Sequence, residues 1–344
     1  MNSENIEIRS LQMTGRSSYI LTLPKEWINT SKLHKNDKIG IITQPDGTLL
    51  ITSKIYREQT RREKHINVND KIDQTYLFRQ LIGAYISGYN SIKLESSTIL
   101  SVSVRNIVNK FIQTTVGQEV MEETGNSITL KDLLNPVEMP FDNTIKRMQI
   151  VVEGMQKDVM QALLTKDKLL LEDVILRDDI LDRLNWLIAR QYNIISRNTS
   201  LAKKMEITAG RSSTSFLISR TIERIGDHIV RLANNILNLI DVEMDNKIVD
   251  NINSASDVAL NIFRKSIASF FKGDIKTAND VIESVKKLEK QYSEINKLAI
   301  QQKGATAVSF GYIVESIRRI GEYAEDISEH VINYLIDEDK KIEK

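Results

Sequence analysis

Residues 218–228 read ISRTIERIGDH, and residues 313–323 read IVESIRRIGEY. At this offset of 95 residues, isoleucine, arginine and glycine recur at matched positions, including Gly226 and Gly321. An offset of 107 residues aligns further positions, Asp167, Val174 and Ile175 with Asp274, Val281 and Ile282. A period near 100 residues indicates a duplicated domain, because solenoid repeats are much shorter.

The repeat lies in a long tract without proline. All four prolines of the chain lie at or before position 140. Because proline breaks helix interiors, a proline-free tract with helical periodicity predicts long helices. The expected helices are 141–165, 168–198 and 213–242 in the first half, and 248–272, 275–302 and 306–338 in the second. We therefore expect two three-helix bundles side by side, with the two mid-helix glycines marking close helix approach.

Residues 1–54 instead show a period near two, which is typical of short strands. The expected elements are a strand around 6–10, a turn at Thr14-Gly15, a strand at 19–23, a short helix begun by Pro24, a strand at 38–42, a hairpin turn at Asp46-Gly47 and a strand at 49–51. A β-rich domain of this size has a small core, so we expect dimerisation to stabilise it.

Residues 55–140 are expected to connect the two parts. Residues 55–64 are rich in Arg, Glu and Lys and are typical of a solvated segment. The pattern beyond them predicts an α/β domain, with strands at 65–68, 91–94, 119–122 and 127–130 and helices at 74–87 and 99–115. The predicted domains are thus 1–54, 55–140, a first bundle at 141–243 and a second bundle at 244–344.

Charge is distributed unevenly along the 344 residues. The net charge is only +1, yet residues 1–64 hold eleven Lys and Arg against seven Asp and Glu. A basic end suggests an anionic partner there, although solubility alone is the simpler interpretation. The chain has no cysteine, which excludes disulfides, thiolate nucleophiles and cysteine-ligated zinc. Without a signal segment or a membrane-spanning apolar stretch, the chain is expected to be soluble and cytoplasmic, with no direct membrane insertion.

The basic end carries a recognisable motif. Residues 9–27 read RSLQMTGRSSYILTLPKEW, and with residues 33–38 and 46–51 they resemble the AbrB/SpoVT swapped-hairpin family. In that family two chains exchange hairpins to build one barrel, and basic residues on one face meet DNA. Carried over by position, the resemblance implies a homodimer whose phosphate contacts come from Arg9, Arg16 and Lys25, with Lys32 and Lys35 behind them. In the alternative, the domain serves only to dimerise the chain.

The helical repeat carries a second motif. Glu223-Arg-Ile-Gly-Asp-His228 and Arg318-Arg-Ile-Gly-Glu-Tyr323 resemble the signature of PhoU, the phosphate uptake regulator. That family has two three-helix bundles and acidic E/D-x-x-x-D motifs associated with metal ions. The combination of both motifs also resembles archaeal regulators of phosphate uptake.

Four carboxylates of the first bundle are the candidate metal ligands, namely Asp178, Asp182, Glu223 and Asp227. They form two pairs at a spacing of four, so each pair shares a helix face, where like charges repel unless a cation lies between them. Oxygen ligands of this kind suit magnesium, calcium, manganese or iron. In the alternative, the face is solvated and is neutralised by arginines, namely Arg177, Arg183 and Arg224.

The second bundle departs from this acidic pattern. Arg318 stands at the position of Glu223, and Val285 with two lysines stands at the position of Asp178 and its neighbours. One cationic side chain in such a cluster could substitute for a metal. We therefore expect at most one site for a divalent or iron-type metal, in the first bundle.

Two functions are consistent with these features. The basic end predicts a dimeric DNA-binding transcriptional regulator of phosphate uptake and homeostasis. The duplicated helical domain predicts instead an adaptor that restrains a phosphate ABC transporter, through its ATPase, or a sensor kinase. An antitoxin-like repressor fits less well, because antitoxins have short tails.

An enzyme is not expected. The sequence contains no His-x-x-x-His pair, no Gly-x-x-x-x-Gly-Lys-Ser/Thr loop and no Gly-x-Gly-x-x-Gly run. Trp27 and Trp186 are expected in a core or an interface rather than as stacking platforms.

Overall fold

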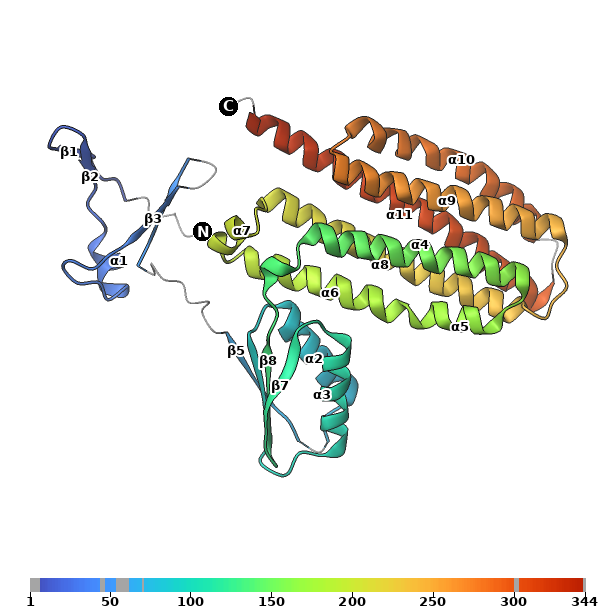
Figure 1. Ribbon diagram of the computed structural model, residues 1–344, viewed down its shortest axis with the longest axis horizontal. Coiled ribbons are helices and arrows are strands. Elements are labelled where there is room, and N and C mark those ends of the chain that lie inside the picture. Colours follow the sequence, from blue (N-terminus) through green and yellow to red (C-terminus); the bar gives the residue numbers. More distant parts are fainter. Residues whose placement is uncertain (1–6, 44–46, 54–61, 70, 300–302, 343–344) are drawn as a thin grey trace. The chain divides into compact units, whose positions relative to one another are not determined.

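The computed structural model describes residues 7–43, 47–53, 62–69, 71–299 and 303–342. The chain divides into two compact units, Met1–Arg61 and Arg62–Lys344, which we call the head and the body (Figure 1). The finer division into domains at 1–54, 55–140, 141–243 and 244–344 stays a prediction.

The head consists of two separate hairpins and one short helix. Its elements are β1 (Gln12–Thr14), β2 (Ser18–Ile20), α1 (Lys25–Thr30), β3 (Gly40–Thr43) and β4 (Leu49–Thr52). Among the described residues, β1 pairs only with β2 and β3 only with β4, and both pairs are antiparallel. Gly15 turns the first hairpin with a φ of +65°, which glycine adopts without strain. Helix α1 starts directly after Pro24, as the sequence predicts.

The strand predicted around 6–10 is wrong. Residues 7–11 are not in a strand, and β1 starts at Gln12. The first hairpin is short: only three residues on each side of its turn pair with one another. Residues before Gln12 therefore have no strand partner in this hairpin. The strand predicted at 19–23 ends at Ile20 for the same reason. Ile6 and Asp46, which the predictions also used, lie outside the described residues.

The body starts with the predicted α/β domain. Its elements are β5 (Glu63–Asn67), α2 (Gln74–Ile86), β6 (Ser91–Glu95), α3 (Val102–Thr114), β7 (Gln118–Glu123), β8 (Ser127–Asp132) and the 3₁₀ turn η1 (Pro136–Glu138). The strand order is β5-β6-β8-β7, with only the β5–β6 pair parallel. Alternate residues of β6 and β8, including Leu94 and Leu130, are buried with Leu77 and Phe111 of the helices. Both helices therefore cover one face of the sheet (Figure 1).

The helical repeat follows as long antiparallel helices. Its elements are α4 (Phe141–Thr165), α5 (Lys168–Leu176), α6 (Asp178–Ile195), α7 (Thr199–Lys204), α8 (Ala209–Leu239), α9 (Asn246–Lys272), α10 (Ile275–Ala299) and α11 (Gly304–Ile342). The predicted helix 168–198 is interrupted at Arg177, whose guanidinium pairs with Asp158 and Asp173 beside the break. Helix α7 lies in the segment between two predicted helices, where the sequence predicts none.

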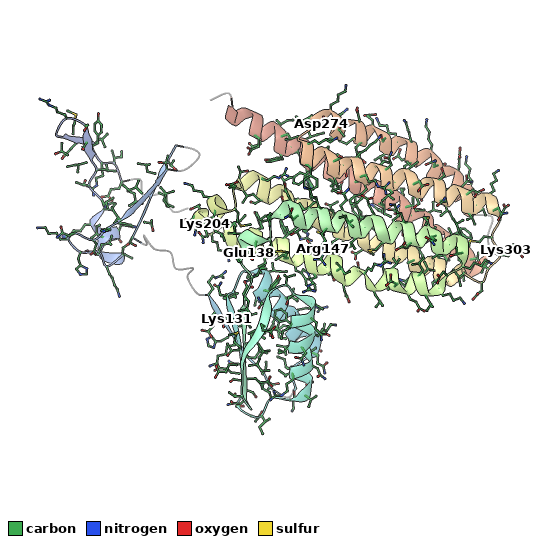
Figure 2. The ribbon with its side chains drawn as sticks, viewed as in Figure 1. Lys131, Glu138, Arg147, Lys204, Asp274 and Lys303 are labelled. Carbon is green, nitrogen blue, oxygen red and sulfur yellow. The ribbon has the colours of Figure 1, made fainter. Side chains whose placement is uncertain are left out.

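The two bundles use the same turn between their first two helices. Lys166 and Gly273 end α4 and α9 in the left-handed conformation, with φ of +57° and +66°. Asp167 then accepts a hydrogen bond from the backbone N–H of Leu170, and Asp274, labelled in Figure 2, accepts one from the N–H of Thr277. The duplication read from the sequence is thus reproduced in the backbone.

The two mid-helix glycines have the predicted packing role. A Cβ atom at Gly226 would lie 2.3 Å from Leu181 Cδ1, and one at Gly321 would lie 2.3 Å from Leu288 Cδ2. Leu181 and Leu288 are themselves equivalent at the offset of 107 residues. Both bundles therefore bring their second and third helices together through the same Gly–Leu contact.

The α/β domain is fixed to α6 by a buried arginine. Arg190 is 1% exposed, pairs with Asp132, and donates to the backbone carbonyls of Tyr85 and Tyr89. Trp186, one turn earlier, contacts the Phe78 ring edge-on at 6.4 Å, as expected for an interface residue. Trp27 is half-buried within the head. No helix in the described part of the chain is long and apolar enough to cross a membrane.

Candidate functional site

The described residues of the head form no hydrophobic core. None of its described residues, 7–43 and 47–53, is buried. Large apolar side chains are exposed instead, namely Ile8, Leu11, Met13, Tyr19, Ile20, Leu21, Ile41, Leu49 and Leu50. An isolated two-stranded hairpin is marginally stable in water. The exposed apolar strands therefore lack the packing that would stabilise them within one chain.

The five predicted DNA-contacting residues are all exposed. Arg16 lies in the β1–β2 turn, Lys25 is the first residue of α1, and Lys32 follows α1 in the left-handed conformation. Lys35 lies in the next turn. Arg9, ahead of β1, is paired with Glu7, so its charge is partly compensated. The other four have no ion-pair partner among the described residues.

The structure brings the four predicted carboxylates together on two neighbouring helices. Asp178 and Asp182 lie on the first two turns of α6, and Glu223 and Asp227 lie in the middle of α8. The close approach of α6 and α8 at Gly226 lies directly beside these carboxylates. A Cβ atom at Gly226 would be 3.6 Å from Asp178 Oδ1. Asp227 is exposed and the other three are half-buried. We call these four residues the acidic cluster.

The carboxylates of the acidic cluster hold their protons more tightly than free carboxylates do. Burial, and then the charges of Asp227 and Asp182, raise the pKa of Asp178 to about 6. Burial and Asp227 raise the pKa of Asp182 to about 6. Burial and the neighbouring carboxylates raise the pKa of Glu223 to about 7. Burial also raises the pKa of Asp227, against the opposing charges of two nearby arginines.

The arginines expected to neutralise this face do not pair with it. Arg177 pairs with Asp158 and Asp173, and Arg224 lies 5.9 Å from the centre of the Tyr323 ring. Within the described residues, none of the four carboxylates forms an ion pair, and Asp178 Oδ1 is buried without a hydrogen-bond partner. The negative charge of Asp178 is therefore not compensated by the described residues.

The acidic cluster fits a hard divalent cation in charge and donor type. The buried, unpartnered Asp178 Oδ1 is the observation that favours this fit. The side-chain positions do not form a coordination shell, because no group of three or more ligating residues converges within the described ranges. The predicted metal site therefore stays a prediction.

In the second bundle the corresponding positions are neutralised from within. Arg318, at the position of Glu223, pairs with Glu322 and with Glu315, the latter at 2.8 Å. Arg319 pairs with the same two glutamates at 2.9 and 3.1 Å. The hydrogen bond from Arg318 lowers the pKa of Glu315, in contrast to the raised values in the first bundle. The Arg318 guanidinium therefore neutralises the carboxylates beside it on α11.

Two partners in these networks were not found from the sequence. Glu315 and Arg319 complete the neutral network of the second bundle, and their spacing of four on one helix is the signal that could have found them. The buried Arg190–Asp132 pair joins residues 58 positions apart, and nothing local announces it.

Family comparisons agree with both parts of this description. The PhoU domain family matches residues 145–236 and 252–331, which are the two helical bundles. The MazE family, described as "Antidote-toxin recognition MazE, bacterial antitoxin", matches residues 12–59, which include the head's two hairpins.

Individual relatives agree with the helical part. A curated relative from Thermotoga maritima, the phosphate-specific transport system accessory protein PhoU homolog 1, is 22% identical over 201 residues, covering 55% of this chain and 82% of the relative. The crystal structure of the phosphate transport system regulatory protein PhoU from Streptococcus pneumoniae is similar with a TM-score of 0.50 and 16% identity, covering 58% of this chain and 94% of that one. PhoU from Pseudomonas aeruginosa gives a TM-score of 0.49 and 19% identity, covering 57% of this chain and 95% of that one.

Proposed function

Because this chain belongs to the PhoU family and carries a MazE-like head, we propose that it is a dimeric, DNA-binding regulator of phosphate uptake. The observation that carries the proposal is the state of the head. Its apolar strands are exposed, and four of its basic residues are free of ion pairs within the described ranges. The regulatory role in phosphate transport comes from the PhoU relatives, whose names place them in that system.

The dimer follows from the missing core of the head. Ile41 is 62% exposed on β3, opposite Ile51 of β4. A second copy that packs its own hairpins on these strands would bury them, and burial of apolar area stabilises by roughly 25 cal/mol per Å². The head would then present the basic residues of two chains to one duplex.

The oligomeric state tests this step. We expect sedimentation equilibrium of the full chain to give twice the monomer mass of 39.3 kDa. Ile41→Asp should shift the mass toward that of the monomer, because it places a charge in the dimer core. Ile150→Asp on α4 is the matched control, since Ile150 is 70% exposed on the body. A wild-type chain that is monomeric at micromolar concentration contradicts the proposal.

DNA binding is tested with the full chain and a labelled duplex taken from upstream of its own gene. We expect fluorescence anisotropy to show that the logarithm of the binding constant falls linearly with the logarithm of the salt concentration. Replacing Arg16, Lys25, Lys32 and Lys35 by Gln should reduce the salt slope by about 1 for each interaction with a phosphate that the substitutions remove.

The control removes the same kind of charge elsewhere. Lys203→Gln with Lys204→Gln changes two exposed lysines at the end of α7, in the body, and should leave binding unchanged. No binding even at low salt, or an equal reduction in this control, refutes DNA binding by the head.

The adaptor function is the second candidate. The body is a single compact unit with continuous cores, and it needs no partner to complete its fold. In this role the head only dimerises the chain, and the body contacts a phosphate transporter ATPase or a sensor kinase. Co-purification of the full chain with the transporter ATPase, together with absent DNA binding, would favour it.

We further propose that the acidic cluster binds a single divalent or iron-type cation. The unpartnered Asp178 Oδ1 and the raised carboxylate pKa values support it. A bound cation would supply the positive charge that Arg318 supplies in the second bundle.

A further inference from the structure

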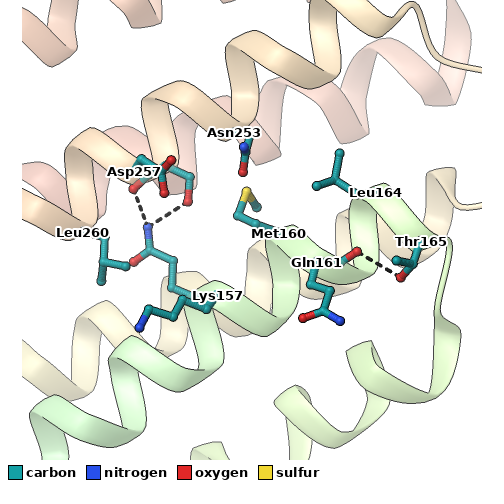
Figure 3. Close-up of a pocket in the computed structure, with 10 residues that line it drawn as sticks. Lys157, Met160, Gln161, Leu164, Thr165, Asn253, Asp257 and Leu260 are labelled. Atoms are coloured by element: carbon teal, nitrogen blue, oxygen red, sulfur yellow. Dashed lines mark hydrogen bonds between the residues drawn. The ribbon is translucent and has the colours of Figure 1, made fainter.

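A cavity lined by polar and apolar side chains lies between α4 and α9, the first helices of the two bundles (Figure 3). Its volume is about 370 Å³, within the range of small-molecule sites. Six of its lining residues matter here, namely Gln156, Lys157, Met160 and Leu164 of α4 and Asn253 and Asp257 of α9. In Figure 3, Asn253 reaches from α9 toward Met160 of α4. None of these residues belongs to the acidic cluster.

The cavity coincides with a difference between the two repeats. At the offset of 107 residues, Gln156 corresponds to Phe263 and Leu164 corresponds to Phe271. Phe263 is fully buried, and Phe271 packs against the core beneath the Lys146 ammonium group, 5.0 Å from its ring. The first repeat thus has two smaller or more polar side chains where the second repeat has phenylalanines.

Gln156 has an unsatisfied polar group at this site. The residue is 1% exposed, and its Nε2 donates to the backbone oxygen and the Oγ of Ser256, both at 2.9 Å. Its Oε1 has no hydrogen-bond partner. A buried amide oxygen without a partner is unfavourable, so the first repeat is less well satisfied at this position than the second repeat is at Phe263.

The cavity also has one cation and one anion without partners. In the part of the chain that the structure describes, neither Lys157 nor Asp257 forms an ion pair, and they do not pair with each other. Arg264, the repeat counterpart of Lys157, pairs with Glu153 at 2.7 Å. The counterpart of Glu153 is Leu260, so Lys157 lacks the acid that the repeat would place beside it.

We propose that this cavity binds a small zwitterion of the amino-acid class. The ligand carboxylate meets the Lys157 ammonium group, and the ligand ammonium group donates to the Asp257 carboxylate. An apolar ligand side chain rests on Met160 and Leu164. This assignment is independent of DNA binding by the head and of metal binding by the acidic cluster.

The test is a thermal-unfolding screen of the full chain with each standard amino acid. We expect at least one to raise Tm in a saturable way, because a ligand that binds only the folded state stabilises it. For the best ligand, the amine that lacks its carboxylate and the acid that lacks its ammonium group should each bind about tenfold more weakly or worse, a loss of about 1.4 kcal/mol. A screen with no saturable shift overturns the proposal, as does an equal shift with inorganic phosphate alone.

Two variants tie binding to this cavity. Leu164→Phe and Gln156→Phe install the residues of the second repeat, and each should abolish the ligand-induced shift while the chain stays folded. Leu169→Phe, at an exposed position of α5, is the matched control and should keep the shift. Lys157→Gln, at an exposed position, should weaken binding without affecting folding. Retention of the full shift in both Leu164→Phe and Lys157→Gln overturns the assignment.

Discussion

The two helical bundles share a backbone and differ in how they treat charge. Both place a leucine of the second helix against a glycine of the third, at Gly226 and Gly321. Beside that contact the first bundle has four carboxylates without ion pairs in the described chain, whereas the second has Arg318 paired with Glu315 and Glu322. The duplication thus preserved the packing, and the charged positions diverged.

This difference separates structural from functional positions. Residues that pack the helices are equivalent in both bundles, so they serve the fold. Residues that are equivalent in sequence position but not in chemistry are free to carry function, because the second bundle shows that the fold does not need them. In the acidic cluster Asp178 and Glu223 are such positions, because their counterparts are Val285 and Arg318. In the α4–α9 cavity Gln156 is one, because its counterpart is Phe263.

The largest expected effect comes from Arg190. Its repeat counterpart, Lys297, is exposed, whereas Arg190 is buried against Asp132. Arg190→Met should lower the free energy of unfolding by about 3–5 kcal/mol, because it leaves a buried carboxylate without its partner. Lys297→Met should change it by less than about 0.5 kcal/mol. Equal effects, measured by urea denaturation, would contradict the assigned interface.

The glycine contacts should be equally sensitive in both bundles. Gly226→Val and Gly321→Val should each cost about 1–3 kcal/mol, because the new side chain overlaps Leu181 or Leu288. Gly311→Ala is the control, since nothing lies within 4 Å of a Cβ there. It should stabilise the helix by about 0.5–1 kcal/mol. If thermal unfolding shows that the losses of stability in Gly226→Val and Gly321→Val differ by more than about 1 kcal/mol, the two glycine contacts are not equivalent.

The pH dependence should differ in sign between the acidic cluster and Glu315 of the second bundle. In the folded chain the carboxyl pKa values of Asp178 and Glu223 are raised to about 6 and about 7, above the usual values near 4. Their contribution to stability is therefore present at low pH and is lost as the pH rises from about 4 to about 7. The pKa of Glu315 is lowered, so its contribution is lost as the pH falls.

Thermal unfolding in a chelating buffer measures this effect, which we expect to be the smallest of the three. Glu223→Gln should reduce the decline in Tm between pH 5 and pH 7. Glu172→Gln, at an exposed position of α5, should leave the decline unchanged. An unchanged decline in Glu223→Gln would show that the acidic cluster does not control it.

Periodicity predicted the helices because they pack along one face for many turns. The predicted helix 141–165 is α4 to the residue, and Pro24 marks the start of α1. The strands of the head were predicted less well, because their pairing depends on a tight turn. Helix α6 was predicted as one piece with α5, since the ion pairs of Arg177 across the break are not visible in a local pattern.

The candidate site was predictable in composition and not in geometry. The spacing of four identified Asp178, Asp182, Glu223 and Asp227, and the structure places them on facing parts of α6 and α8. Whether they converge on an ion depends on side-chain positions that no spacing determines. The contacts of Arg190 and Gln156 join helices far apart in sequence, so they became visible only in the fold.

We propose that the acidic cluster of the first bundle serves a cation, whereas the second bundle is neutralised by its own arginine. The most direct measurement is the metal content of the purified full chain by plasma mass spectrometry, with Asp227→Ala and its repeat counterpart Glu322→Ala beside it. We predict a single bound ion in the wild type and in Glu322→Ala, and its loss in Asp227→Ala. Metal content that is unchanged in Asp227→Ala, or reduced equally in both variants, would contradict the claim.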